Sequence, residues 1–496
     1  MKKTLFKLIA TSLVCTAVFG FIGCSDMLSK FDSIQWGATY TVRHLLQDLD
    51  RDGNDVAAGR YTEDTYERET LVNTIPNTLS EAKAKNIPGF TPTVTNDKIE
   101  QVIVNGDGST TIDIYYNRNP VTLTFDAGEG KFYDDSNNEV NSKEITQHYG
   151  TTMSLRKPVY DTAGSAFTNV EFYDFIPADT NSKSLQKSSR GDYIYLTIPA
   201  VNGNYRTLWN ISTDVSNIKN DTKIPSGNLK LTGTVSKENL SYLAQALNIP
   251  GTTEVNLDFS GLELPAEFDE NNRFTFGADE RNNYNPAIHS NALSQVTLPK
   301  TGMILLGYGA FSRCPSLKSI TIGSNVEVLH GGAFWGSTKL HFEVDSNHPS
   351  LVATSDGTAL LRKKQDEAEK IEYSLVSYPS ASGNINLGKL GFTITAIEED
   401  ALALLPDGNT TITFPATVKV IGPYADYQID QGAHLTIIME GTEPAELPGE
   451  GVNPCSTFGT EVHIYVPDES VDTYKAASEW LKYAANIYPM SKYGSH

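Results

Sequence analysis

Short runs in which apolar and polar residues alternate occur along most of the chain, whereas helical periodicity is scarce. The segment 38–44 (Ala-Thr-Tyr-Thr-Val-Arg-His) alternates as a half-buried strand does, and similar runs begin at Val121 and His148. Residues 101–104 and 110–116 flank an Asn-Gly-Asp-Gly sequence, which predicts a hairpin. Thr, Asn, Gly, Tyr and Ile are frequent, and together these features predict a mainly β protein.

The strongest internal repeat lies between residues 293 and 344. Its Leu-x-x-Val/Ile-x-Leu/Ile pattern begins at Leu293, recurs at Leu317 and returns in degraded form at Leu340, at offsets of 24 and 23 residues. A Gly-Ala-Phe sequence lies between the copies, at 309–311 and again at 332–334. A fixed period of this size indicates a solenoid, because one short strand cannot bury its apolar face alone and stacked neighbours close a continuous core.

Two predicted helices bracket the repeats. Ser236 is a candidate N-cap for the first helix, and the second covers 469–486 and ends before Pro489. We interpret both as caps, because an open solenoid end exposes core and unpaired strand. The expected apolar stripes are Leu240, Leu243 and Leu247 in the first helix and Val471, Tyr474, Leu481, Ala484 and Tyr488 in the second.

The sequence of residues 309–334, GAFSRCPSLKSITIGSNVEVLHGGAF, closely resembles the BspA-type leucine-rich repeat. The resemblance implies that 228–490 is a leucine-rich-repeat solenoid with N- and C-terminal caps. An insert at 349–383 and an Asn-rich stretch at 268–291 interrupt the period. Asn325 occupies the position where leucine-rich repeats use a side-chain amide to satisfy backbone groups at the bend.

The preceding segments resemble two other families of bacterial surface modules. Residues 36–119, with YTVRHLLQDLDRDG, GFTPTV and VNGDGSTTIDIYYNRN, are similar to the mucin-binding-protein-type repeat. Residues 120–210, with VTLTFDAGEGKF and YGTTMSLRKP, resemble the internalin B-repeat, which implies a small β-grasp-like unit. Residues 211–227 are polar and end in Pro-Ser-Gly, so we interpret them as a linker. The predicted fold is therefore mainly β, with two small β-grasp-like modules followed by the solenoid.

The N-terminus has the features of a secretory signal peptide. Three lysines precede an apolar stretch from Leu8 to Ile22, and Gly23 is followed by Cys24. This arrangement resembles the bacterial lipobox, which implies cleavage after residues 1–23, a diacylglycerol on the Cys24 thiol and a short tether at 24–35. An uncleaved transmembrane anchor is the alternative interpretation, since the apolar stretch is just long enough to span a bilayer.

The charge of the chain argues against some classes of partner. The formal net charge is −21, and removal of residues 1–23 takes away three lysines and no acidic residue, which gives −24. An acidic chain is poorly suited to nucleic acid, which needs clustered Lys and Arg. After that cleavage and apart from Cys24, only Cys314 and Cys455 remain, so at most one disulfide can form and packed cores must supply the stability.

The residues that could support chemistry are few. Asp48, Asp50 and Asp52 with the following Gly53 copy the first half of an EF-hand loop, but its twelfth position is Gly59, so we interpret this segment as a solvated acidic loop. Three histidines, His330, His341 and His348, lack metal-ligand spacing, and Cys314 falls at a repeat position that favours a packed thiol. We predict no catalytic residue, metal or cofactor.

Surface recognition is the function that remains. Thr297, Thr321 and Thr413 occupy outward strand positions, and we predict that they form a row of small residues that suits a protein or glycan partner. The resemblance implies a lipid-anchored adhesin, exposed on the bacterial outer membrane, whose partners are host matrix or mucosal proteins or other bacterial surfaces. A non-adhesive protein that organises the envelope and a lipoprotein hydrolase are the alternatives.

Overall fold

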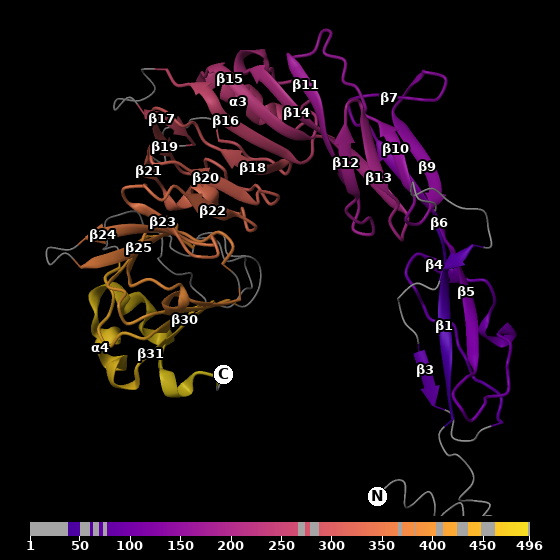
Figure 1. Ribbon diagram of the computed structural model, residues 1–496. Coiled ribbons are helices and arrows are strands. Elements are labelled where there is room, and N and C mark those ends of the chain that lie inside the picture. The colour runs from indigo at the N-terminus through magenta and orange to yellow at the C-terminus, as the bar shows by residue number, and fades with distance from the viewer. Residues whose placement is uncertain are drawn as a thin grey trace, which may run out of the picture. The chain divides into compact units, whose positions relative to one another are not determined.

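The computed structural model describes residues 38–49, 60–62, 69–72, 77–265, 273–277, 287–365, 370–381, 383–402, 410–423, 435–447 and 462–494. The predicted signal peptide 1–23, Cys24, the tether 24–35, the predicted loop residues Asp50 and Asp52, and Cys455 lie outside these residues. The described part is mostly strands with few helices, which confirms the mainly β prediction (Figure 1). None of its helices has the length and apolar character needed to cross a bilayer.

The chain divides into two compact units. The first contains the described residues of Met1–Phe125, Lys143–Lys157 and Pro177–Tyr205. The second contains those of Asp126–Ser142, Pro158–Ile176 and Arg206–His496.

In the first unit, a sheet forms around the parallel pair β1 and β5. Its strands are β1 (Thr39–Gln47), β2 (Tyr61–Thr62), β3 (Glu69–Val72), β4 (Phe90–Pro92) and β5 (Thr111–Arg118). β1 confirms the strand predicted at 38–44. The predicted hairpin is wrong, because β1 and β4 occupy the two edges of β5. Residues 102–104 instead form backbone hydrogen bonds with 77–80.

The rest of the first unit contains a small antiparallel sheet with the order β10-β13-β12. Its strands are β10 (Thr152–Arg156), β12 (Gln186–Arg190) and β13 (Tyr193–Thr197). Two other strands, β6 (Pro120–Asp126) and β9 (Ser142–His148), pair with each other outside this small sheet. Leu155, Ile194 and Leu196 are buried on one face of the small sheet. Because side chains alternate along a strand, the opposite face carries the other side chains of β10 and β13, among them the exposed Tyr193 and Tyr195.

A continuous series of parallel strands forms much of the second unit (Figure 1). In spatial order these are β14 (Gly203–Asp214), β15 (Gly227–Thr234), β16 (Val255–Glu263), β18 (Leu293–Thr297), β20 (Ser319–Ile322) and β22 (His341–Val344). β11 (Asn169–Pro177) pairs with β14. Val296 lies opposite Ile320, which lies opposite Phe342, so the pattern repeated in the sequence becomes a buried row across neighbouring strands.

A second parallel sheet of β17 (Arg273–Phe276), β19 (Met303–Leu306) and β21 (Val326–Leu329) belongs to the same repeats. A row of phenylalanines runs through the same core. Ring centroids of successive pairs lie 5.4 Å apart for Phe259–Phe276, 5.4 Å for Phe276–Phe311 and 6.3 Å for Phe311–Phe334. The Gly-Ala-Phe sequences therefore supply one aromatic ring per repeat to the core.

Buried polar side chains satisfy the backbone where the repeats turn. Cys314 Sγ accepts a hydrogen bond from Ser290 N and donates one to Ile288 O, while Ser337 Oγ accepts from Cys314 N and donates to Phe311 O. Ser290, Cys314 and Ser337 are spaced one repeat apart and are at most 2% exposed. The predicted role of Asn325 is confirmed, because its Nδ2 donates to the carbonyls of Pro299 and Gly302.

The insert near 349–383 interrupts the parallel series. β23 (Leu351–Ala353), β24 (Leu360–Gln365) and β25 (Ile371–Ser377) pair antiparallel to one another. Beyond them, a separate parallel sheet has the order β26 (Asn384–Asn386), β28 (Thr410–Phe414), β30 (Leu435–Met439), β31 (Val462–Val466) and β32 (Ile487–Pro489). β27 (Ile394–Ile397) pairs in parallel with β25 and β29 (Val420–Ile421). Leu298 and Ile322 belong to one hydrophobic core, whereas Phe414 belongs to a second.

The first predicted helix is confirmed and the second needs correction. Helix α3 (Lys237–Ala246) begins after Ser236, whose Oγ accepts a hydrogen bond from Asn239 N, and it buries Leu240 and Leu243. The second predicted helix breaks at Ala477, which has an extended backbone, into α4 (Val471–Ala476) and the 3-10 segment η6 (Ser478–Asn486). The break changes which side chains face the core: Leu481 is 58% exposed, while Trp480 and Tyr483 are buried.

Residues 211–227, which we expected to be a linker, form part of the packed second unit. They include the end of β14 and the 3-10 segment η2 (Val215–Asn217). Ile211, Val215, Ile218 and Ile224 are each at most 2% exposed and belong to the first hydrophobic core. These isolated apolar residues carry no clear periodicity, which explains why the sequence pattern did not reveal their burial.

Trp480 and Leu481 offer a matched test of the corrected C-terminal packing. The Trp480 indole donates a hydrogen bond to Ala445 O at 2.8 Å and is fully buried. Trp480→Ala is expected to lower the free energy of unfolding by about 3–5 kcal/mol, because it leaves a large cavity. Leu481→Ala is expected to change it by less than about 0.5 kcal/mol. Urea unfolding followed by circular dichroism measures both, and equal effects would contradict this packing.

Burial also makes Cys314 chemically inert. It raises the pKa of the Cys314 thiol to about 11, so the thiolate forms only as the pH approaches that value. In a chain that begins after Cys24 and carries Cys455→Ser, Cys314 is the only thiol. We expect no reaction with a disulfide reagent at pH 8 in the native state and one equivalent after denaturation. Rapid labelling of the native chain at pH 8 would show that the thiol is accessible.

Candidate functional site

The outward side chains of the parallel strands β14 to β22 form two rows, which we call the strand face. Successive side chains alternate between the two faces of a sheet, so every second residue of each strand points away from the core. The first row is Asn210, Asn228, Asn256, Gln295, Ser319 and His341. The second row is Ser212, Lys230, Asp258, Thr297, Thr321 and Glu343. All twelve residues are polar, so this face offers hydrogen bonds and charge.

The first row begins with a ladder of asparagine amides. Asn228 Nδ2 donates to Asn210 Oδ1 at 2.7 Å, and Asn256 Nδ2 donates to Asn228 Oδ1 at 2.8 Å. Asn256 Oδ1 is buried and accepts no hydrogen bond within the described structure. A buried acceptor without a partner costs about 1–3 kcal/mol, so the ladder leaves one hydrogen bond unmade at this end.

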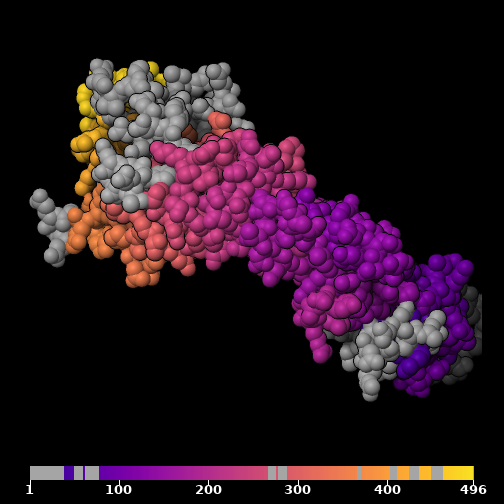
Figure 2. Space-filling view, turned by 90° about the horizontal axis from the view of Figure 1, so that it is seen from above, coloured from indigo at the N-terminus to yellow at the C-terminus, as the bar shows by residue number. Residues whose placement is uncertain are grey.

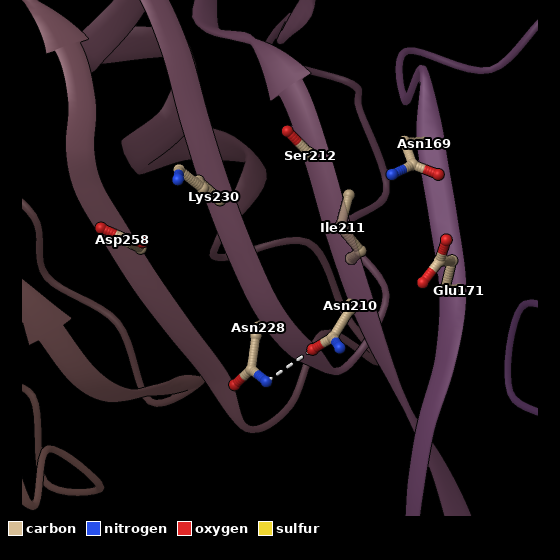
Figure 3. Close-up of a pocket in the computed structure, with 8 residues that line it drawn as sticks. All are labelled: Asn169, Glu171, Asn210, Ile211, Ser212, Asn228, Lys230 and Asp258. Atoms are coloured by element: carbon tan, nitrogen blue, oxygen red, sulfur yellow. Dashed lines mark hydrogen bonds between the residues drawn. The ribbon is translucent and has the colours of Figure 1, made fainter.

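A shallow groove of about 270 Å³ lies over the first three strands of the strand face, β14, β15 and β16, and the neighbouring β11. Figure 3 shows Lys230 of β15 between Ser212 of β14 and Asp258 of β16, with Glu171 of β11 along the opposite edge. The remaining lining residues are Asn169, Asn210, Ile211 and Asn228. One ammonium between carboxylates, with amides and a hydroxyl beside it, matches a polar ligand that both donates and accepts hydrogen bonds.

The structure places two of the three predicted threonines together. Thr297 of β18 lies directly opposite Thr321 of β20 on the strand face. Thr321 Oγ1 donates to Glu343 Oε2 at 3.1 Å, so a carboxylate borders the threonine pair. Thr413 lies on β28, in the sheet beyond the antiparallel insert, where its neighbours are Asn386 and Ile438. The predicted continuous row of three threonines is therefore wrong, because β28 belongs to a different sheet from β18 and β20.

The asparagine ladder has a signal in the sequence, but it lies outside the repeat of about 24 residues. An Asn followed by Ile or Leu recurs at Asn210, Asn228 and Asn256, each time at the start of an alternating run. The spacings of 18 and 28 residues do not form a fixed period, so a search for a repeat of about 24 residues passes over them. Only strand pairing shows that these three residues are neighbours.

Two of the three histidines considered in the sequence, His348 and His330, make contacts within the fold, whereas His341 lies on the strand face. His348 Nε2 lies 3.1 Å from Val326 O, and its Nδ1 accepts a hydrogen bond from Leu351 N. Burial lowers the His348 pKa, which fits a neutral ring between a carbonyl and an amide. The His330 ring stacks on Tyr308 with centroids 4.4 Å apart. Among the described residues, no group of three or more His, Cys, Asp or Glu side chains is arranged to bind a metal ion.

Comparison with known proteins identifies a repeat family in part of the chain. Residues 274–349 match the family model described as BspA type Leucine rich repeat region (6 copies). No curated protein matches the chain. Among solved structures, a leucine rich cell surface protein from Faecalibacterium prausnitzii A2-165 is 14% identical, and the match covers 64% of this chain and 95% of that one with a TM-score of 0.25. The predicted resemblance to BspA-type repeats is thus confirmed over 274–349, which includes Thr297 and Thr321.

Proposed function

We propose that this chain is an exported, lipid-anchored bacterial surface protein that binds a host or bacterial macromolecule non-covalently. Its BspA-type repeats and the strands that pair with them are proposed to form a leucine-rich-repeat solenoid. In this proposal the strand face is the recognition surface, and the diacylglycerol on Cys24 holds the chain at the outer membrane. Acyl chains must supply the attachment, because the chain, whose net charge is −24 after removal of residues 1–23, is repelled by anionic lipid.

The observation that supports this function is the composition of the strand face. Twelve polar side chains stand in register on six strands whose inward side chains form a packed core. In the space-filling view, the segments of the second unit coloured magenta to orange form one closely packed surface (Figure 2). A rigid sheet presents such groups without the entropy loss of ordering a loop, which favours binding. Three carboxylates border or belong to this face, so binding should weaken as salt rises.

Thr297 and Thr413 provide a matched pair for testing the strand face. Both are half-buried threonines on parallel strands, but only Thr297 belongs to this face. We expect Thr297→Arg to reduce affinity for an immobilised host matrix or mucosal protein at least tenfold, because the long cation blocks the flat surface. Thr413→Arg should change affinity less than twofold. Surface plasmon resonance with the chain beginning after Cys24 measures both, and thermal melts show whether each variant is folded.

The same experiment separates adhesion from a structural role. If the wild-type chain shows no saturable binding to a broad panel of matrix proteins, mucins and bacterial surface polymers, the non-adhesive role in organising the envelope is favoured. If binding exists and both arginine variants lose it equally, the strand face is not the recognition surface.

The anchor is tested by Cys24→Ala. Without the thiol there is no diacylglycerol, and we expect the protein to move from the detergent phase to the aqueous phase in Triton X-114 partitioning. Cys314→Ala serves as the control, because that buried thiol should leave the partitioning unchanged. Retention of the Cys24→Ala protein in the detergent phase would contradict lipid anchoring and favour an uncleaved transmembrane segment.

A further inference from the structure

The small antiparallel sheet of the first unit carries an unusual outward face. Its nine outward residues, which we call the arginine–tyrosine face, are Thr152, Ser154 and Arg156 on β10, Tyr193, Tyr195 and Thr197 on β13, and Gln186, Ser188 and Arg190 on β12. Tyr193 is 45% exposed and Tyr195 is 39% exposed. Large aromatic side chains that remain this exposed on a regular sheet are candidates for binding a partner.

The cross-strand register gives this face a defined order. Tyr193 lies between Arg156 and Arg190, and the neighbouring row places Tyr195 between Ser154 and Ser188. Adjacent strands are about 4.8 Å apart, so the two arginine backbones lie about 10 Å apart with an aromatic ring between them. Tyr, Ser and Arg in one patch are also the residues that binding surfaces favour, because they combine rigid contact area with hydrogen bonds.

The charge of this face contrasts with that of the chain. The formal net charge of the protein is −21, yet the nine outward residues include two arginines and no carboxylate. The one acidic residue between β12 and β13, Asp192, lies in the turn that joins them. Guanidinium groups bind sulfate and carboxylate groups through paired hydrogen bonds, so this arrangement is complementary to an anionic ligand.

The uncharged side chains of this face indicate which class of anionic ligand it suits. The face carries no aliphatic side chain, and seven of its nine positions carry a hydroxyl or an amide group. Apart from the two tyrosine rings, the face lacks the apolar side chains that usually form the centre of a protein interface. A sulfated or uronic-acid polysaccharide presents anionic groups, many hydroxyls and flat sugar rings that can lie on tyrosine. We therefore propose that the arginine–tyrosine face binds an anionic polysaccharide, independently of the strand face in the second unit.

Heparin binding by the chain that begins after Cys24 tests this proposal. We expect saturable binding at 50 mM salt, measured by isothermal titration calorimetry, and weaker binding as salt rises. Arg156→Gln with Arg190→Gln should lower affinity at least tenfold and make the logarithmic salt dependence shallower by about two charges, because two contacts that release counterions are lost. Lys339→Gln with Lys419→Gln makes the same change in net charge at exposed positions of the second unit and should have less than a twofold effect.

Heparin binding by variants of Tyr193 distinguishes recognition of a polysaccharide from simple attraction between charges. Tyr193→Ala should lower affinity for heparin at least fivefold, whereas Tyr193→Phe should retain most of it because the ring face is kept. Poly-glutamate of similar charge should bind at least tenfold more weakly than heparin. Absence of heparin binding by the wild-type chain, equal losses in the arginine and lysine variants, or equal affinity for poly-glutamate would each overturn the proposal. Thermal melts exclude variants that fail to fold.

Discussion

The constraint on which the second unit depends is that a strand of four or five residues cannot bury its apolar side chains alone. Val296, Ile320 and Phe342 are buried because each of their strands pairs in parallel with the next at matching register. The phenylalanine row fills the same core, and Ser290, Cys314 and Ser337 satisfy backbone groups where each repeat turns. Removing one such residue therefore disturbs two neighbouring repeats.

The candidate binding surfaces follow from that same pairing. A sheet that directs every second side chain into the core must direct the others outward, so residues distant in sequence become neighbours on one flat face. The asparagine ladder of Asn210, Asn228 and Asn256 arises in this way in the second unit. In the first unit, antiparallel pairing brings Arg156 and Arg190 to the two sides of Tyr193. Both faces are polar, but their charges differ, which suits them to different ligands.

The antiparallel insert limits how far one face can extend. β23, β24 and β25 replace the parallel ladder with antiparallel pairing, and β26 and β28 beyond them lie in a new sheet, whose Phe414 belongs to the second hydrophobic core. Thr413 shares the local pattern of Thr297 and Thr321, yet it belongs to that later sheet. Local pattern therefore identifies which side chains point outward, whereas continuity of the sheet decides which of them can touch the same ligand.

The sequence alone determined the β class, the period near 24, the BspA-type repeats over 274–349, the Ser236 cap and the role of Asn325, because these depend on residues close in the chain or on strict periodicity. Only the tertiary structure decided that 211–227 is packed, that Trp480 rather than Leu481 is buried, and that Thr413 is separate. These outcomes depend on where a helix breaks and which strands pair. Both are set by long-range packing, which outweighs local pattern wherever the period is interrupted.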